Sequence, residues 1–492
     1  MEISLPTDAT KEDMKWVSIM DFWPPSSSLL VMIVCSIYNS RSTSATPSRS
    51  QLFSKKCCQQ HMNYRRAKIQ LSFYTGLTLA SLCSPNVFII MPSVSEMASN
   101  VFVLDNGGYT IKAGFSTDSE PRIIPNCITK AKSERRRQFV GNQLDECKDF
   151  SGLYYAYPTQ RGYMVNWDIE KQVWDHVFST DHFSVDFKET CMIVTEPYFN
   201  FVAMQESMIE ILFEDYKFHS IYRVNAGTLS AYKSQRTSSE LCCLVVDSGF
   251  SFTHIIPYIK GKKLKNSTRR IDVGGKILTN HLKEIISYRQ LNVMDETYVM
   301  NQVKEDVCYV STDFWNDLKK AQLRSKENTI VRDYVLPDYT VIRRGYVRPL
   351  EETTGKAKEN EQLIRMNNER FMVPEILFHP SDVNIREMGI SEAIVHVIES
   401  CPEEIQPHLY KNIVLTGGNA CFPGFKERVY NDVRSEAPSL CDVKIILPEN
   451  PVTNAWEGGT LIPSDPEFHK LIVTRKQFEE NGINFCLEKF DV

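Results

Sequence analysis

The chain has 492 residues, of which 42% are hydrophobic and 24% are charged, and its formal net charge is −5. Such a length is too great for one compact core, so two or more domains are expected. The small net charge gives no overall attraction to nucleic acid or to an anionic membrane. The 14 cysteines are scattered and form no C-x-x-C pair, which favours buried free thiols in a reducing compartment over disulfides or zinc.

Residues 1–97 differ in composition from the rest of the chain. Residues 22–95 contain no acidic residue and are rich in serine. The apolar run at 29–35 is too short to span a bilayer, which needs about 20 residues. Because acids crowd the first positions, a secretory signal is disfavoured. We therefore expect residues 1–97 to be a disordered or mis-assigned N-terminal extension, with Met97 as a natural alternative start.

The first predicted element is a hairpin over 101–115. An apolar run ends at Asp105, Gly107 and Gly108 form the turn, and a second run begins at Ile111. Loops at strand ends offer backbone N–H groups to phosphate, and a carboxylate can hold a hydrated cation. The basic run that follows, at 130–137, is typical of a solvated loop, with contact to DNA or an acidic partner as the alternative.

The next predicted elements alternate between helices and strands. Asn166 is a suitable N-cap for a helix whose apolar face runs from Ile169 to Phe178. The remaining predictions are a buried strand at 191–196, an amphipathic helix at 204–216, and a strand at 222–225 that leads into a helix at 226–233.

A second hairpin repeats the design of the first. The apolar run 241–246 ends at Asp247, Ser248 and Gly249, and another run begins at 252. This repetition suggests two related halves. A third strand, at 413–416, ends in Gly417 and Gly418. These three loops together predict a nucleotide held between two similar domains.

The C-terminal half contains further predicted elements. The lysine-rich stretch 260–265 is interpreted as a hairpin tip, and 302–323 as one helix that carries Lys304 and Glu305. The charged residues 351–370 predict a surface loop. A helix is expected to start behind the glycine turn at 423–424.

These motifs together resemble actin and the actin-related proteins over about residues 98–492. The matching stretches include LDNG at 104–107, KAGF at 112–115, VTEP at 194–197, VDSG at 246–249, THIIP at 253–257, NERF at 368–371, LTGG at 415–418 and WEGG at 456–459. The resemblance implies an α/β actin-like fold, in which two similar lobes close around ATP or ADP with Mg²⁺ or Ca²⁺. It also implies one actin-like domain over 98–492, with a charged excursion near 343–370.

The resemblance also implies roles for individual residues. Asp105 and Asp247 match the carboxylates that hold the metal through water, and Lys112 matches the lysine that reaches the phosphates. Lys304 and Glu305 match contacts on the adenosine side. His254 and Asn225 match the side chains that order the attacking water and are the catalytic candidates. The other implied nucleotide-binding residues are Asn106, Gly107, Gly108, Ser248, Gly249, Gly417 and Gly418.

Several departures from the actin pattern bear on activity. Gly108 and Tyr109 stand where actin has serine and glycine, and Phe250 and Ser251 stand where it has aspartate and glycine. A tyrosine in place of a glycine removes φ freedom and adds bulk beside the ligand. Asn225 is one methylene shorter than actin's glutamine, which should slow hydrolysis because water must be placed accurately. We therefore expect nucleotide binding with weak or absent turnover.

Other departures concern assembly. The stretch between Pro125 and Gly141 is shorter than the loop with which actin grips its neighbour, and 343–365 differs wholly from actin's plug region. Filaments need matched surfaces at both ends, so a homopolymer is not expected. An active ATPase of the actin and sugar-kinase superfamily and a cytoskeletal filament protein remain the alternatives.

Three stretches, at 106–109, 246–251 and 343–346, resemble a nuclear class of actin-related proteins. Members of that class are structural subunits of SWR-type (SRCAP-type) ATP-dependent chromatin-remodelling complexes, which exchange a core histone for its Z variant. The implied partners are a zinc-finger HIT-type subunit, a separate motor subunit, and nucleosomes with their histones and DNA, but no membrane. The implied location is the nucleus, with the cytoplasm as a second possibility.

Overall fold

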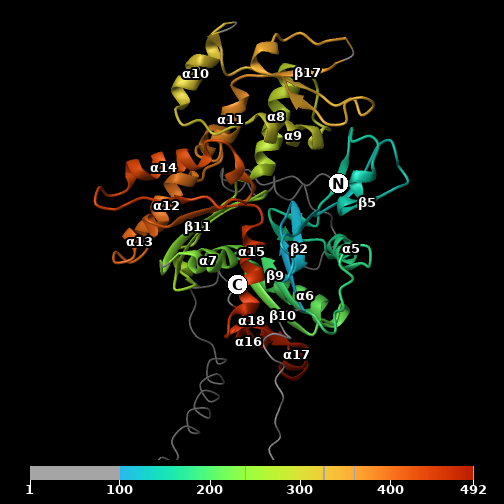
Figure 1. The fold of residues 1–492 in the computed structure, drawn as a ribbon, viewed down its shortest axis with the longest axis vertical. Helices are drawn as coiled ribbons and strands as arrows, with labels where there is room; N and C mark the ends of the chain where they lie inside the picture. The colour runs from blue at the N-terminus through green and yellow to red at the C-terminus, as the bar shows by residue number, and fades with distance from the viewer. Residues whose placement is uncertain (1–99, 239, 325–326, 360, 491) are drawn as a thin grey trace, which may run out of the picture. The chain divides into compact units, whose positions relative to one another are not determined.

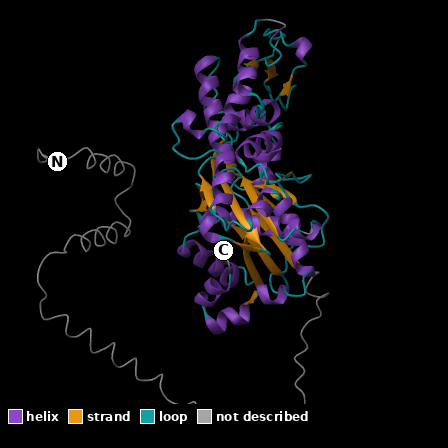
Figure 2. Cartoon of the chain, turned by 90° about the vertical axis from the view of Figure 1, so that its left-hand side faces the viewer, coloured by secondary structure: helices purple, strands orange, loops and turns teal. Residues whose placement is uncertain are grey.

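A computed structural model describes residues 100–492 except 239, 325–326, 360 and 491 (Figure 1). The predicted extension over residues 1–97 lies outside the described residues. The described chain contains two larger sheets, each of six strands, with helices on either side of the strands (Figure 2). The predicted α/β actin-like fold is confirmed.

The first large sheet has the strand order β20-β10-β9-β1-β2-β3. Strands β1 and β2 are antiparallel, with Asp105 opposite Lys112, and β1, β9 and β10 are parallel to one another. The strands are β1 (Val101–Asn106), β2 (Thr110–Phe115), β3 (Arg122–Pro125), β9 (Cys191–Glu196), β10 (Ser220–Asn225) and β20 (Val473–Thr474).

The second large sheet repeats this arrangement. A hairpin of β11 and β12 is followed by β18 and β19, each parallel to its neighbour, and β13 and β14 pair with β12. The strands are β11 (Cys242–Ser248), β12 (Thr253–Ile259), β13 (Lys262–Lys263), β14 (Arg269–Ile271), β18 (Ile413–Thr416) and β19 (Ile445–Ile446). In both sheets the hairpin strand with an aspartate as its next-to-last residue lies beside a parallel strand, which confirms the predicted duplication.

Smaller sheets lie outside the two large ones. They are formed by β4 (Ile128–Lys130), β5 (Phe139–Val140) and β6 (Tyr154–Ala156), by β7 (Thr159–Gln160) and β8 (Tyr163–Met164), and by β15 (Arg332–Val335), β16 (Tyr346–Val347) and β17 (Leu363–Met366).

Helices cover the sheets and connect their parallel strands. In the N-terminal half they are α5 (Trp167–Phe178), α6 (Val202–Glu210), which continues as a π-helical turn (Ile211–Asp215), and α7 (Ala226–Thr237). The later helices are α8 (Gly275–Arg289), α9 (Thr297–Val307), α10 (Phe314–Gln322), α11 (Glu369–Glu375), α12 (Ile390–Glu399), α13 (Gln406–Tyr410), α14 (Phe425–Glu436), α15 (Asn454–Leu461), α16 (Phe468–Leu471), α17 (Arg475–Asn481) and α18 (Ile483–Lys489).

Two predictions on secondary structure are wrong. Residues 302–323 are not one helix, because α9 ends at Val307 and Asp313 caps a new helix, α10. Residues 351–370 are not all loop, because Leu363–Met366 forms β17 and pairs with β15. Within this excursion, Arg348 is buried and paired with Glu361.

Helix α5 begins where the sequence predicts. The Oδ1 atom of Asn166 accepts a hydrogen bond from the backbone N–H of Ile169 at 3.1 Å. The buried face of the helix contains Val173, Trp174 and Val177 and packs on the first sheet.

We expect Asn166→Ala to lower the free energy of unfolding by about 1 kcal/mol, because the N–H of Ile169 loses its acceptor. Urea denaturation of the purified chain measures this loss. Asn166→Ser is the control, since serine also caps helices and should restore most of the stability. Equal losses of stability in the two variants would show that the capping hydrogen bond is not the source of the loss.

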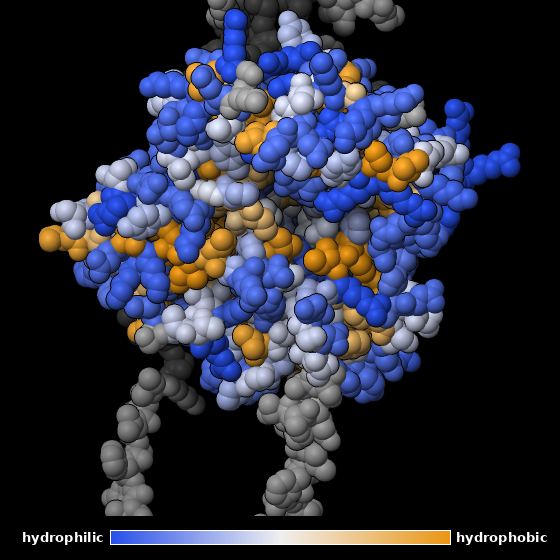
Figure 3. Space-filling view, turned by 45° about the horizontal axis from the view of Figure 1, so that its top comes forward, coloured by the Kyte–Doolittle hydropathy of each residue, from blue (hydrophilic) through white to orange (hydrophobic). Residues whose placement is uncertain are grey.

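The apolar cores lie around the two sheets. The larger cluster of buried residues packs against one face of the second sheet, and a smaller one packs against one face of the first. Separate clusters cover the opposite faces of the two sheets. On the outer face seen in Figure 3, apolar side chains form separate groups among hydrophilic ones. Among the described residues, no helix combines the length and apolar character needed to span a membrane.

Candidate functional site

A cavity of about 520 Å³ lies between the strand ends of the two sheets. This volume is within the range of sites for small ligands. The structure brings most of the predicted residues to its wall: Asp105, Asn106, Gly107, Gly108, Lys112, Asp247, Gly249, His254, Lys304, Glu305, Gly417 and Gly418. It does not bring Ser248 or Asn225 there.

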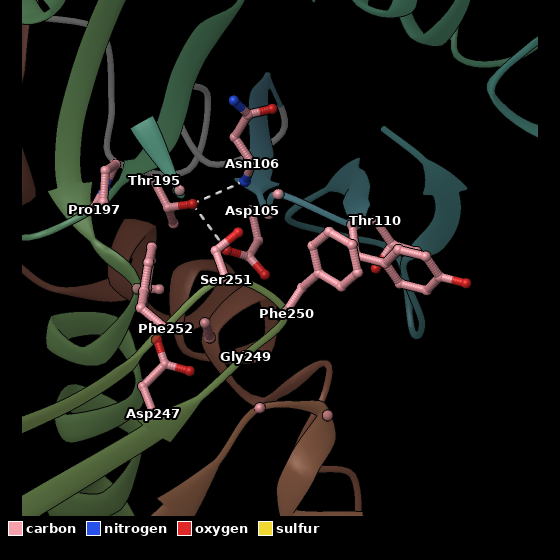
Figure 4. A pocket seen from close by; sticks show the side chains of 18 of the residues that line it. Asp105, Asn106, Thr110, Thr195, Pro197, Asp247, Gly249, Phe250, Ser251 and Phe252 are labelled. Carbon is pink, nitrogen blue, oxygen red and sulfur yellow. Dashed lines mark hydrogen bonds between the residues drawn. The ribbon is translucent and has the colours of Figure 1, made fainter. Parts of the chain in front are cut away.

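Asp105 is fixed at the end of β1. Its carboxylate lies 3.1 Å from the Nζ atom of Lys112 and accepts a hydrogen bond from the Thr195 hydroxyl at 2.8 Å. The same hydroxyl accepts from the backbone N–H of Asn106 at 2.8 Å (Figure 4). Thr195 at the end of β9 therefore orients both the carboxylate and the start of the first loop.

Asp247 at the end of β11 is the second carboxylate of the cavity. Its side chain has no hydrogen bond to any described residue, and its pKa rises to about 6 because it is buried and faces Asp105, while Lys112 acts in the opposite direction. Two carboxylates that repel each other, with one lysine paired to Asp105, leave room for a further positive charge. The pair thus fits a hydrated divalent cation.

The two loops that follow these strands carry unpaired backbone donors. Gly108 and Tyr109 in the first loop, and Phe250 and Ser251 in the second, line the cavity. None of their four N–H groups donates a hydrogen bond to a described residue. Groups of this kind form anion sites, so the loops fit the phosphates of a nucleotide.

Lys304 and Glu305 lie on α9 at the opposite wall. The Nζ atom of Lys304 donates to Thr279 at 3.0 Å and to Asn301 at 2.9 Å, and burial lowers its pKa. Glu305 accepts from Asn301 at 2.7 Å. Asn301 therefore connects the two predicted adenosine-side residues.

Gly417 allows the turn after β18 to lie against β11. Its φ is +90°, and a Cβ atom there would lie 2.3 Å from the carbonyl oxygen of Ser248. Only glycine combines this backbone conformation with so close an approach. Ser248 itself is buried, with its hydroxyl bonded to Thr253 and Asn419. We therefore assign Ser248 to the support of the turn and not to the cavity wall.

Asn225 is engaged by protein groups on both sides of its amide. Its Nδ2 atom donates to the Glu196 carbonyl at 3.1 Å, and its Oδ1 atom accepts from the Nζ atom of Lys263 at 2.7 Å. The side chain is fully buried. Because it is buried and does not line the cavity, it presents no donor or acceptor to a water molecule there.

His254 lines the cavity but is packed among aromatic rings. The rings of Tyr198 and Phe252 have centroids 4.9 and 4.2 Å from that of the imidazole. Neither ring nitrogen has a described partner, and burial holds the pKa well below its usual value. The imidazole is therefore neutral, and its donor and acceptor nitrogens are both buried without a described partner.

Some residues of this site were not predicted from the sequence. Glu170 and Trp174 on α5 hold the Asn106 side chain, and Asn301 holds Lys304 and Glu305. Thr195 lies in the VTEP motif at the carboxyl end of a parallel strand, where ligand-binding residues gather, so its position was the available signal. The other three occupy helix positions with no such signal.

A family model for actin matches residues 96–491 of the chain. Actin-related protein 6 of Drosophila melanogaster is 46% identical over 395 residues, which cover 78% of this chain and 98% of that protein. Actin-related protein 6 of Arabidopsis thaliana is 37% identical and covers 80% of this chain and 99% of its own length. The protein of the same name from Dictyostelium discoideum is 32% identical, with coverage of 83% and 98%.

Proposed function

Since this chain belongs to the actin family, we propose that it is a nuclear, non-polymerising structural subunit of a SWR/SRCAP-type chromatin-remodelling complex. Its relatives named actin-related protein 6 mark it as a non-conventional actin-related protein. In this role a bound nucleotide holds the two lobes together. The proposal depends above all on one observation: the cavity keeps both carboxylates, whereas Asn225 is occupied by Lys263 and Glu196.

The proposed ligand is ATP or ADP with Mg²⁺ or Ca²⁺. Asp105 and Asp247 would hold the cation through water, and Lys112 with the two loops would hold the phosphates. Lys304, Glu305 and Gly418 would face the adenosine. The cation would supply the positive charge that the two carboxylates lack. Because the ligand would contact both sheets, it would stabilise the folded chain by mass action. The gain is about 2.7 kcal/mol when the free nucleotide concentration is 100 times Kd.

Slow hydrolysis follows from the same geometry. A water-positioning side chain must lie within hydrogen-bond reach of the attacking water. Of the two catalytic candidates, Asn225 is bonded to Glu196 and Lys263 and does not line the cavity, so only His254 lines it. Steady hydrolysis that disappears in both Asn225→Ala and His254→Ala would instead favour an active ATPase.

The proposed partners follow from the likeness to actin-related protein 6. They are a zinc-finger HIT-type subunit, the motor subunit, and the nucleosome with its histones and DNA. Affinity purification of the tagged full chain from nuclei, followed by mass spectrometry, tests this assignment. Recovery of remodelling subunits is expected. Recovery of cytoskeletal proteins alone, or sedimentation of the pure chain with ATP and salt, would favour a filament protein.

We expect the double variant Asp105→Ala, Asp247→Ala to lose bound nucleotide and the stabilisation that nucleotide gives. The measurement is the melting temperature with and without saturating Mg-ATP, together with the nucleotide extracted after denaturation. Asp168→Ala is a matched control, because this carboxylate is exposed on α5. If wild type contains no nucleotide and Mg-ATP leaves its melting temperature unchanged, the two carboxylates serve only the turns.

A further inference from the structure

Two aromatic rings from opposite halves of the chain meet at the edge of the cavity. Tyr109 follows β1, and Phe250 follows β11. Their ring centroids lie 4.9 Å apart at an interplanar angle of 27°, which is a stacked arrangement. Figure 4 shows Phe250 directed toward the loop that precedes Thr110. The contact therefore joins the two loops that would hold the phosphates.

A hydrogen bond fixes the Tyr109 ring to the second half of the chain. Its hydroxyl accepts from the Nδ2 atom of Asn301 on α9 at 3.2 Å. Asn301 is itself held by Lys304, Thr279 and Glu305. Burial raises the pKa of Tyr109 above its usual value, so the ring carries a neutral hydroxyl. We call Tyr109, Phe250 and Asn301 the aromatic latch.

Further groups support the Phe250 side of the latch. The ring of Tyr157 lies 5.7 Å from that of Phe250, and Tyr155 stacks on Tyr157 at 5.5 Å. The Nζ atom of Lys276 lies 5.3 Å from the Tyr157 ring centroid. Phe250 is therefore packed from behind and is not free to turn away from Tyr109.

The latch separates two cavities. All three of its residues line the 520 Å³ cavity, and all three also line a second cavity of about 470 Å³. The loops approach closely beside the stack, since a Cβ atom on Gly108 would lie 3.3 Å from the Ser251 hydroxyl oxygen. A ligand that moves from the first cavity to the second must separate the two rings.

We propose that the aromatic latch slows the release of a nucleoside di- or triphosphate through the second cavity. This inference rests on the proposed nucleotide binding at the carboxylate pair and adds a structure that sets the rate of nucleotide release. Opening requires loss of the stack and of the hydrogen bond between Tyr109 and Asn301. Together these contacts slow release by about 10- to 100-fold, given the usual strength of each contact. The chain then keeps its nucleotide through purification and assembly.

The test is a chase experiment with the full-length chain. The protein is loaded with radiolabelled ATP and Mg²⁺, excess unlabelled ATP is added, and the label that remains is measured over time. We expect release to be about 10- to 100-fold faster in Tyr109→Ala, Phe250→Ala than in wild type. Tyr109→Phe keeps the ring and loses only the bond to Asn301, so its rate should lie between the two.

The association rate of nucleotide distinguishes a latch from side chains that simply contact the ligand. Loss of a latch speeds entry as well as release, whereas loss of a ligand contact speeds release alone. Phe478→Leu is the matched control, because its ring stacks on Phe213 at 4.8 Å, packs against the core of the first sheet, and does not line either cavity. This control should release and bind nucleotide as wild type does.

Each outcome assigns the failure to one of the two ideas. If wild type cannot be loaded with ATP and the double variant loads readily, the latch is supported, because the closed rings then block entry as well as release. Equal release and association rates in wild type and Tyr109→Ala, Phe250→Ala overturn the latch and leave nucleotide binding intact. Nucleotide binding in none of the proteins, with none extracted from wild type, overturns the proposed function and the latch together.

Discussion

Replacing Arg223 by methionine is expected to lower the free energy of unfolding by about 3–5 kcal/mol. Arg223 on β10 and Glu196 on β9 form an ion pair in which both side chains are fully buried, with 0% of either exposed. The Nε and Nη2 atoms of Arg223 donate to Glu196 at 3.0 and 2.6 Å. The variant leaves the Glu196 carboxylate buried, with only Asn200 still donating to it.

Loss of the ion pair should also disturb the cavity wall, because Glu196 lines the cavity and its carbonyl accepts a hydrogen bond from Asn225. Urea denaturation measures the loss of stability. In the double variant Arg223→Met, Glu196→Gln the buried charge is gone, so most of the stability should return. Asn200 can still donate to the glutamine oxygen.

A surface pair provides the matched control. Arg344 is 64% exposed and lies 2.9 Å from Asp306, so Arg344→Met should cost less than about 1 kcal/mol. A loss in Arg223→Met no larger than that in Arg344→Met would contradict the expected effect. It would mean that Glu196 takes up a proton or reaches water once its partner is removed.

The strands around the site could be predicted because local signals agree. In both hairpins an apolar run ends at an aspartate followed by a glycine turn, and the observed register places Asp105 opposite Lys112 and Asp247 opposite His254. Asn166 marked the start of α5 for a similar reason, since a cap acts within its own turn. In these cases the residues that determine the turn or the helix start lie within a few positions of it in the sequence.

The break between α9 and α10 could not be predicted in this way. The residues after Val307 continue the apolar pattern, so the sequence favours one helix. The backbone N–H groups of Tyr309 and Val310 instead donate to the carbonyls of Arg370 and Pro423, both at 2.9 Å. Partners so distant in sequence end the helix. Strand β17 was missed because Arg365 and the charges before it obscure the alternation that buries Ile364 and Met366.

The same limit applies to the cavity. Its carboxylates and glycines stand in recognisable loops, whereas the state of each side chain depends on remote residues. Asn225 is engaged by the Glu196 carbonyl and by Lys263, and Tyr109 is fixed by a bond to Asn301, 192 residues away. Residue identity thus predicted most of the residues that line the cavity but not which of its groups are engaged by other parts of the chain.

Glu170 gives the second large expectation, which concerns pH. The carboxyl group on α5 is completely buried, and burial raises its pKa from 4.5 to about 7, although hydrogen bonds from neighbouring side chains oppose the rise. One oxygen accepts from the Nδ2 atom of Asn106 at 2.6 Å, and the other has no described partner. The folded chain therefore binds a proton at Glu170 that the unfolded chain has already lost between these two pKa values.

Stability must fall as pH rises through this window, because the folded state holds more protons than the unfolded state. The contribution of Glu170 is fully present below pH about 4.5, declines up to pH about 7, and is constant above it. A shift of this size corresponds to about 3 kcal/mol. Asp247 acts in the same direction, so the effect of Glu170 is isolated only by comparison with a variant.

Glu170→Gln supplies that comparison, since glutamine keeps an acceptor for Asn106 and does not titrate. We expect the stability of the variant relative to wild type to increase by about 3 kcal/mol between pH 5 and pH 8. Urea denaturation at several pH values measures this difference, and Glu210→Gln, at an exposed position of α6, should follow wild type throughout. Parallel curves for Glu170→Gln and wild type would mean that Glu170 is ionised in the folded chain. In that case a positive group or water must reach its second oxygen, and Asn106 would be held by a charge and not by a neutral acid.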